Sequence, residues 1–471
     1  MKNHKYRLEN LVIYDYRGVE EHLSQMAAKG WELEKAGSSL WKYRRIEPAQ
    51  IRYAVTYSPD ASRFNPGPTV GQQSLEELCA AAGWKKICDW NQMQIFSSRE
   101  EHPMPLETDE GLRLENIHRA MKKSLLLGNL VLLLLALFWG VSIWGTLFTA
   151  PFKVLSSNGK LFSGSMWTFL ALLELYTFAH YFLWRRRSLR SIADGGGCVP
   201  LGRGCQIVNK LSWAVLALLL AGFLLAELIL GNRGSILYLS MYMSLFFVVV
   251  FLVRKTTELL QNRKVSKGAN IVGTLVVDVV LCLALIGGLA YVSIHFGWFS
   301  KDSGETYEYQ NRDWDARPVE GAPLTLSGLT GESYAHIRRE WVREGSLLLP
   351  SWSFWERALP EDSDEARGMA YTIWDTENSW MYQSIVDNFQ EKSKLVFSAY
   401  WMGRPENPAD WGVEAVYRRY FIGSGGESPE SVFLLCQPGR IVRLELDGEP
   451  SAAERQRMVQ ALFPESTRRE S

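Results

Sequence analysis

The sequence predicts a multi-domain membrane protein. We expect an N-terminal α+β domain with a ferredoxin-like βαββαβ order, a five-helix transmembrane bundle and a C-terminal α+β domain. Short alternating patterns, then long apolar runs, then a tryptophan-rich segment follow one another along the chain. These changes of pattern place the parts at residues 1–98 and 124–299, joined by a charged connector, 99–123, and followed by 300–471.

The net charge of zero hides an uneven distribution. Of the 51 basic and 51 acidic residues, 18 and 17 lie in residues 1–123, 14 and 5 in residues 124–299, and 19 and 29 in residues 300–471. The last segment is acidic and therefore a poor match for nucleic acid, which Lys and Arg bind by neutralising phosphates. We expect no direct nucleic-acid partner.

The N-terminal part alternates between strand-like and helical patterns. The Gly-Trp pairs Gly30-Trp31 and Gly83-Trp84 each end a helix and begin a strand. This weak internal repeat favours two βαβ halves under one antiparallel sheet. The predicted elements are strand Leu8–Tyr14, helix Gly18–Lys29, strand Trp31–Arg45 with Gly37 as the candidate bend, strand Ile51–Tyr57, helix Ser74–Ala82, and strands Lys85–Trp90 and Met93–Ser97.

A family resemblance covers about residues 8–98. Its motif comprises Tyr14-Asp15-Tyr16, Glu20-Glu21-His22-Leu23, Met26 through Leu33, Tyr43 through Glu47-Pro48 to Tyr53-Ala54-Val55, and Gly83-Trp84. These residues resemble the bacterial domain of unknown function 2812. The resemblance implies a soluble domain placed before hydrophobic spans in Gram-positive bacteria, in a regulatory or envelope-sensing context. It implies no catalytic residues.

Five apolar stretches are long enough to cross a hydrocarbon core of about 30 Å. The N-terminus has no apolar signal region, so we expect the first stretch to act as the insertion signal. A helical pattern in the connector, with Leu112, Leu114, Ile117 and Met121, runs into it. The predicted spans are 124–148, 165–184, 211–230, 235–253 and 271–299.

Basic residues in short loops predict the orientation, because such loops stay on the cytoplasmic side. The loops 185–210 and 254–270 carry eleven Lys and Arg residues, whereas the alternate loops carry three, Lys153, Lys160 and Arg233. We therefore expect a multi-pass cell-membrane protein with a cytoplasmic N-terminus and, since the number of spans is odd, an extracytoplasmic C-terminus.

Three ionisable residues inside the predicted spans form the candidate intramembrane site. Glu174 lies near the centre of span two, His180 lies nearer its cytoplasmic end, and Asp278 lies about two turns into span five. Ionisable groups in a bilayer are costly and raise a functional hypothesis, here a proton or cation relay through His180–Asp278 or Glu174–Asp278. The alternative is that each group pairs with a neighbouring helix or is protonated, and only packs.

The C-terminal part predicts a separate α+β domain large enough for its own core. We expect a helix over Glu377–Phe389, antiparallel strands over Val413–Phe421, Ser431–Cys436 and Arg440–Leu446, and turns at Gly423–Gly426 and Pro438-Gly439. A closing helix, Ser451–Phe463, has a capping box of Ser451 and Glu454. Its eight Trp residues suit either core packing or stacking against a ligand.

No motif predicts an enzyme, a cofactor or a metal site. Cys198 and Cys205 have loose spacing and no His nearby, the Gly-rich loop around them lacks a P-loop ending, and His336–Glu340 lacks a second zinc-binding His. Cys436 is the one cysteine in the predicted external domain, so it has no intramolecular disulfide partner there.

Three functions remain open at this level. The first is a non-enzymatic membrane regulator or sensor that meets an extracytoplasmic ligand and contacts a cytoplasmic regulatory protein. The second is a transporter or channel subunit that uses Glu174, His180 and Asp278. The third is a scaffold for envelope assembly. Membrane lipid is an expected partner in each case.

Overall fold

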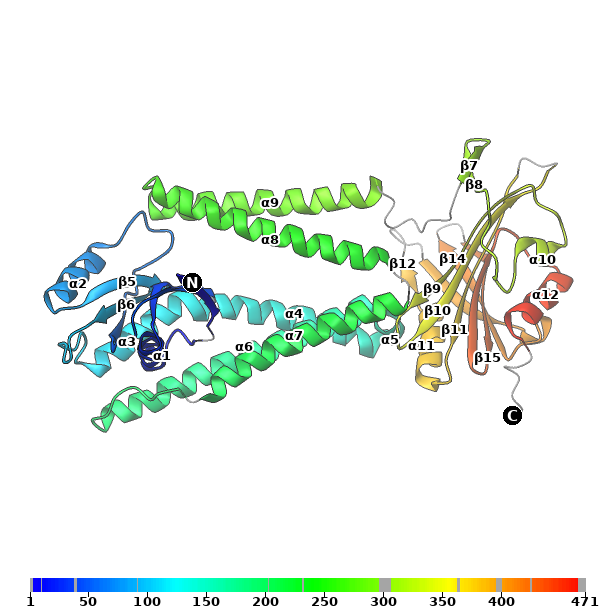
Figure 1. The fold of residues 1–471 in the computed structure, drawn as a ribbon. Helices are drawn as coiled ribbons and strands as arrows, with labels where there is room; N and C mark the ends of the chain where they lie inside the picture. Colours follow the sequence, from blue (N-terminus) through cyan, green and yellow to red (C-terminus); the bar gives the residue numbers. More distant parts are fainter. Residues whose placement is uncertain are drawn as a thin grey trace. The chain divides into compact units, whose positions relative to one another are not determined.

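The computed structural model describes most of the chain (Figure 1). The described residues are 3–9, 11–37, 40–90, 92–201, 203–230, 233–295, 306–361, 365–394, 400–423 and 426–464. They form two compact units. The first comprises residues 1–139, 166–219 and 240–289, and the second comprises residues 140–165, 220–239 and 290–471. Each unit is described by itself below.

The N-terminal domain consists of two consecutive βαββ repeats. In each repeat the first strand pairs antiparallel with the third, and the third pairs with the second, which gives the sheet orders β1-β3-β2 and β4-β6-β5. The first repeat holds β1 (His4–Leu8), α1 (Tyr16–Ala28), β2 (Trp31–Lys35) and β3 (Leu40–Arg45). The second holds β4 (Arg52–Tyr57), α2 (Val70–Ala81), β5 (Lys85–Trp90) and β6 (Met93–Ser98).

The two repeats share local details as well as topology. After its helix, each repeat has a glycine with a φ of +82°, Gly30 or Gly83, because the turn into the next strand needs the left-handed conformation. Each second strand also has a register shift against the third, between Leu33 and Lys35 in one repeat and between Lys86 and Cys88 in the other. The weak repeat in the sequence is therefore a structural duplication.

Two predicted strands differ from the structure. Strand β1 lies at His4–Leu8, and residues 11–15 form the loop before α1 instead of a strand. This loop is buried, and the Tyr57 hydroxyl donates to the carbonyl of Ile13 at 2.7 Å, which replaces a sheet partner. The predicted strand Trp31–Arg45 is a hairpin of β2 and β3.

The extra strand explains why the predicted ferredoxin-like sheet is not found among the described residues. With a hairpin in each half, each half completes a three-stranded sheet of its own. The two sheets meet at β2 and β5, and the rings of Trp41 and Trp90 pack edge to face at 5.1 Å. One core, which includes Val19, Leu23 and Ile95, lies between α1 and the two sheets.

Five described helices are long and apolar enough to cross a membrane, which is consistent with a multi-pass membrane protein. The connector continues into the first of them without a break, as expected, through one π-helical turn, η1 (Lys122–Leu126). The helices are α3 (Glu110–Met121) with η1 and α4 (Leu127–Thr149), then α6 (Asn158–Ala193), α7 (Arg203–Ile229), α8 (Arg233–Asn262) and α9 (Lys267–His295). Trp298 and the predicted end of the fifth span at Phe299 lie outside the described residues.

The C-terminal domain is built on an eight-stranded antiparallel sheet, in the order β12-β13-β14-β15-β16-β11-β10-β9. Its strands are β9 (His336–Gly345), β10 (Pro350–Leu359), β11 (Arg367–Asp375), β12 (Ser393–Lys394), β13 (Tyr400–Glu406), β14 (Ala415–Gly423), β15 (Gly426–Gln437) and β16 (Arg440–Leu446). A separate hairpin joins β7 (Thr306–Tyr309) to β8 (Arg312–Asp315), and η2 (Pro408–Asp410) is a short 3-10 turn.

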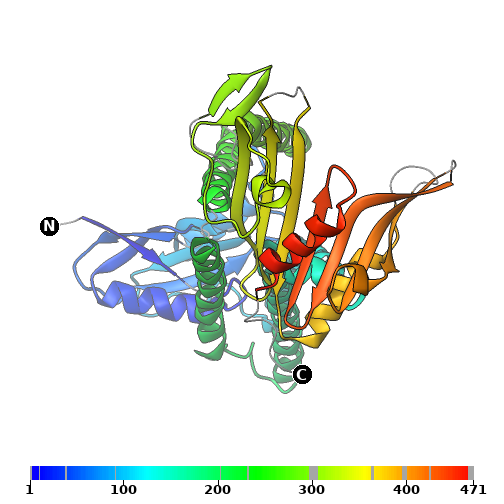
Figure 2. The same cartoon turned by 90° about the vertical axis from the view of Figure 1, so that its right-hand side faces the viewer.

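Helices cover both faces of this sheet. One face packs its main apolar core against α10 (Leu326–Thr330) and α12 (Ala452–Leu462), and Figure 2 shows α12 lying across the strands. The other face packs against α11 (Ser379–Gln390) and the short α5 (Pro151–Leu155). The predicted capping box is confirmed, because Ser451 and Glu454 bond reciprocally at the start of α12.

Candidate functional site

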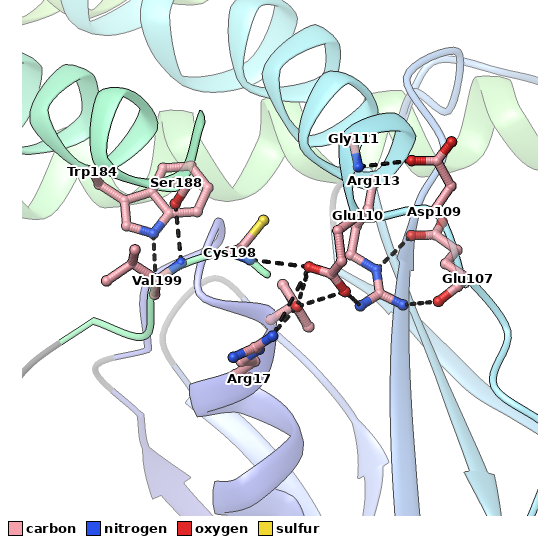
Figure 3. Close-up of polar contacts among 11 residues, drawn as sticks. Arg17, Glu107, Asp109, Glu110, Gly111, Arg113, Trp184, Ser188, Cys198 and Val199 are labelled. Atoms are coloured by element: carbon pink, nitrogen blue, oxygen red, sulfur yellow. Dashed lines mark hydrogen bonds and ion pairs between the residues drawn. The ribbon is translucent and has the colours of Figure 1, made fainter. Parts of the chain in front are cut away.

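The candidate functional site is a junction in the first unit, where three segments distant in sequence meet (Figure 3). They are the start of α1, the start of α3, and the end of α6 with the loop that follows, residues 194–201. Side-chain caps fix both helix starts. Asp15 accepts the Gly18 amide, and Asp109 accepts the amides of Gly111 and Leu112. We refer to this region as the junction.

Glu110, in the first turn of α3, is the acceptor on which the junction is centred. Its carboxylate accepts from Arg113 Nη1 at 2.6 Å, from the Tyr16 hydroxyl at 3.1 Å and from the backbone amide of Cys198 at 3.0 Å. The Arg17 guanidinium lies 3.9 Å away. These charge-assisted bonds join α1, α3 and the loop after α6 through one side chain.

Arg113 is held from several directions. Its guanidinium also donates to the carboxylate of Glu107 at 2.9 Å and to its carbonyl at 2.7 Å, and it stacks over the Tyr16 ring at 4.7 Å. The Arg113 side chain is 13% exposed. Burial raises the pKa of Glu107 above its usual range, while Arg113 acts in the opposite direction. Removing either partner would leave a partly buried charge uncompensated.

The backbone of the loop after α6 is fixed by side chains on both sides. The Val199 amide donates to the Ser188 hydroxyl at 3.1 Å, and its carbonyl accepts from the Trp184 indole at 2.9 Å. The Leu201 amide bonds to Asp15, so this carboxylate both caps α1 and holds the loop. Burial raises the pKa of Asp15, and these amide bonds oppose that shift.

An aromatic cluster extends the junction along α6. The Tyr14 ring meets Tyr181 edge to face at 5.1 Å and Trp184 at 4.9 Å. The Tyr14 hydroxyl lies 2.8 Å from His180 Nδ1, and the Tyr181 hydroxyl lies 2.8 Å from His118 Nδ1 on α3. The loop before α1 is thus packed directly against α6 through Tyr14.

The arrangement binds and positions segments, and it presents no activated nucleophile. Cys198 is buried, and burial raises the pKa of its thiol to about 11, which keeps it protonated and unreactive near neutral pH. The side chain of Cys205 lies outside the described residues. The described residues contain no cluster of His, Cys, Asp and Glu that could hold a metal ion.

In the second unit, α5 and the start of α6 are attached to the C-terminal domain. The Phe152 amide donates to Ser384 Oγ on α11 at 2.7 Å, and the Ser346 hydroxyl donates to the Leu155 carbonyl. Asn158 Oδ1 accepts the Leu347 amide at 3.1 Å. The Asn158 amide nitrogen donates to the buried Glu227 at 3.3 Å.

The three predicted intramembrane residues have different partners in the structure. Glu174 is buried in α6 and hydrogen-bonds to Asn129 of α4, while His180 pairs with Tyr14 as described. Asp278 lies on α9 beside Cys282, at 4.0 Å from its sulfur. The contacts of the described residues do not bring Asp278 to Glu174 or His180, and the relay stays a prediction.

The sequence pointed to His180 but not to most of the junction. Tyr14, Asp15 and Tyr16 belong to the resemblance motif, which gave them no role. The sequence around Cys198 suggests only a metal or phosphate site, and both motifs are incomplete. In the structure the backbone amides of Cys198 and Val199 are the bonding groups. The Glu110–Cys198 bond joins residues 88 positions apart, and no local pattern in the sequence predicts such a pair.

Comparison with known proteins gives one match. Residues 15–128 match the model of a family described as "Protein of unknown function (DUF2812)". Neither the curated proteins nor the solved structures gave a match. The matched segment runs beyond the predicted residue 98, through α3 into α4, so it contains Asp15, Tyr16, Glu110 and Arg113 but not the loop after α6. Residues 15–128 are therefore a domain of the DUF2812 family, as the motif predicted.

Proposed function

We propose that this protein is a non-enzymatic integral membrane regulator or sensor. In this proposal the C-terminal domain lies outside the cell and meets a ligand or partner. The DUF2812 domain lies in the cytoplasm and contacts a regulatory protein. The five apolar helices embed the chain in the cell membrane and couple the two domains.

The contacts of the loops support this topology. The DUF2812 domain is bonded to the loop after α6. Asn270, in the first turn of α9 and at the end of the predicted loop 254–270, donates to the Phe64 carbonyl at 3.2 Å. Both loops belong to the basic set that predicts a cytoplasmic location. The alternate segment, α5 to Asn158, contacts the C-terminal domain instead. With five spans, the N-terminal and C-terminal domains lie on opposite sides of the membrane, which agrees with these contacts.

The observation that carries the proposal is that α6 has a different folded domain bonded near each of its ends. Near its beginning, Asn158 accepts the Leu347 amide of the C-terminal domain. Near its other end, His180 and Trp184 contact Tyr14 of the DUF2812 domain. A helix resists bending through its backbone hydrogen bonds, so a displacement at one end is transmitted to the other.

Hydrogen exchange in the full chain, reconstituted in lipid nanodiscs, tests this coupling. The variant Asn158→Ala loosens the outer attachment of α6, and we expect faster exchange at residues 11–15 and 194–201, in the junction. Gln383→Ala is the matched control, because Gln383 lies on the exposed surface of α11 and bonds to Asp387. Unchanged junction exchange in Asn158→Ala would count against coupling through α6.

Crosslinking in cells tests the output. A photo-crosslinker placed on the exposed face of α2 is expected to capture a cytoplasmic protein, and deletion of residues 306–464 is expected to change the yield. A chain without an inner partner, and with no response to that deletion, would not be a regulator.

A transporter or channel subunit is the second candidate, and the buried Glu174 favours it, since buried carboxylates in spans are costly. The triple variant Glu174→Gln, His180→Asn and Asp278→Asn tests it. Ion or solute flux into proteoliposomes that is equal for this variant and the wild type would exclude the transport function.

A further inference from the structure

The C-terminal domain contains a cavity of about 280 Å³ between the sheet and α11. One wall is apolar and is formed by Trp374, Ile385, Phe389 and Leu434. The floor is polar and is formed by side chains of the strands. A small cavity that combines an apolar wall with a few placed polar groups is the usual form of a ligand site.

The polar floor is a row that crosses four neighbouring strands. Ser353 of β10 pairs with Thr372 of β11, which pairs with Arg443 of β16, and paired residues in neighbouring strands point to the same face. The row continues to β9, where Glu344 Oε2 accepts from the Ser353 hydroxyl at 2.7 Å. A carboxylate therefore lies at one end of the row, a guanidinium lies at the other, and two hydroxyls lie between them.

Arg443 is weakly neutralised for a residue in a sheet face. It forms an ion pair with Glu445 at 3.3 Å, and the two side chains are 42% and 51% exposed, so solvent screens the pair. Arg419 is a second cation close enough to interact electrostatically with it. An Arg fork in this setting favours a carboxylate ligand, which it can bind through two parallel hydrogen bonds.

We propose that this cavity binds a small zwitterionic ligand, an amino acid or a short peptide. The ligand carboxylate bonds to Arg443, its ammonium group faces Glu344, and an apolar side chain packs against Trp374 and Phe389. The inference deepens the proposed function and rests on it only for the outward orientation of the domain.

The cavity also offers a route for a signal. Phe152 and Ser156, from the segment that joins α4 to α6, line its edge, and the Phe152 ring packs edge to face on Trp374 at 5.6 Å. A ligand side chain against Trp374 therefore contacts the same surface that holds α5. Filling the cavity favours the position of α5 that leaves room for the ligand. In the chain α4 directly precedes α5 and α6 follows it, so both helices are connected to this movement.

Calorimetry with the full chain in nanodiscs tests the proposal. The probes are L-leucine and L-alanyl-L-leucine, with isocaproate, which lacks the ammonium group, and isopentylamine, which lacks the carboxylate. We expect at least one zwitterion to bind and both truncated probes to bind about tenfold or more weakly. If leucine binds more tightly than the dipeptide, the ligands are free amino acids. If the dipeptide binds more tightly, they are short peptides. If neither zwitterion binds, the proposal is wrong.

Two variants locate the binding. Arg443→Gln is expected to weaken zwitterion binding about tenfold or more, and Thr372→Val, which keeps the side-chain shape, several-fold. Arg404→Gln is the charge-matched control, since Arg404 pairs with Glu427 on β13 and β15 of the same sheet. Wild-type affinity in both cavity variants would overturn the site. If a zwitterion binds but the amide hydrogen exchange of residues 11–15 and 194–201 stays the same, the proposed coupling through α6 is wrong, whereas the ligand site still stands.

Discussion

At the residue scale, buried charge is concentrated where segments must be held together. The Glu110 carboxylate accepts hydrogen bonds from three groups and lies 3.9 Å from the Arg17 guanidinium. Arg113 donates to two carboxylates and stacks on an aromatic ring. Satisfied charges of this kind specify one arrangement more than they add stability, because their desolvation offsets much of their attraction. The junction is therefore suited to holding a defined position that a coupled element can change.

Glu20, on α1, predicts a pH dependence of the DUF2812 domain. It accepts the Val55 amide at 2.9 Å, and burial raises the pKa of its carboxyl to about 7. A raised carboxyl pKa contributes stability that is fully present below the unfolded pKa, near 4.5, and is lost as pH rises through about 7. We expect the free energy of unfolding to fall by about 1 kcal/mol between roughly pH 6 and 8 from this group.

Glu20→Gln removes this dependence, since glutamine resembles the protonated carboxyl and keeps an acceptor for Val55. Protease resistance of the domain in the full chain, followed across that pH range, measures it. Glu21→Gln is the control, because Glu21 is exposed and its carboxylate accepts from the Gln25 side chain one turn further along α1. Equal pH slopes in wild type and Glu20→Gln would contradict the prediction.

At the element scale, the loop after α6 packs so closely against α1 and α3 that a single added methyl group at Gly197 would disturb it. A Cβ on Gly197 would clash with Arg17 Nη2 and come to 3.0 Å from Glu110 Oε2. We expect Gly197→Ala to destabilise the docked loop by about 1–3 kcal/mol, as overpacking does. Gly71→Ala in α2 meets no atom within 4 Å and is expected to be neutral or slightly stabilising.

Amide exchange of residues 194–201 and thermal unfolding of the full chain measure both substitutions. Faster loop exchange in Gly197→Ala alone is the expected result. A Gly197→Ala protein with wild-type loop protection would show that the loop is not fixed by these contacts.

Elements with local signals were predictable from the sequence. Strand β16 matches the predicted Arg440–Leu446, and α12 is marked by its capping box. The hairpin of β2 and β3 is not evident from the sequence, because Gly37 is equally compatible with a bend inside one strand. Strands β9 to β11 were not predicted; in β9 (HIRREWVREG), consecutive charged residues hide the alternation of a strand. The junction and the ligand cavity depend on pairs far apart in the sequence.

At the scale of the whole molecule, reporter fusions can test the proposed membrane topology. Fusions after residues 60 and 195 are expected to report a cytoplasmic location, and fusions after residues 160 and 400 an external one, because the basic loops stay inside. A reporter after residue 160 found in the cytoplasm would overturn the orientation and with it the external ligand site.

The family match reaches from Asp15 into α4 and ends before α6, so it includes one side of the junction. The loop after α6 and the C-terminal domain lie outside it.

Helix α6 is longer than a bilayer requires. Its 36 residues extend about 54 Å, against a hydrocarbon core of about 30 Å, so several of its turns would extend beyond a bilayer. A tilt of about 5° about Asn158 moves His180 by about 3 Å, because the two residues are about 33 Å apart along the helix. In the coupling proposed above, a ligand in the cavity of the C-terminal domain would change the tilt of α6. A displacement of that size is enough to break the hydrogen bond between Tyr14 and His180.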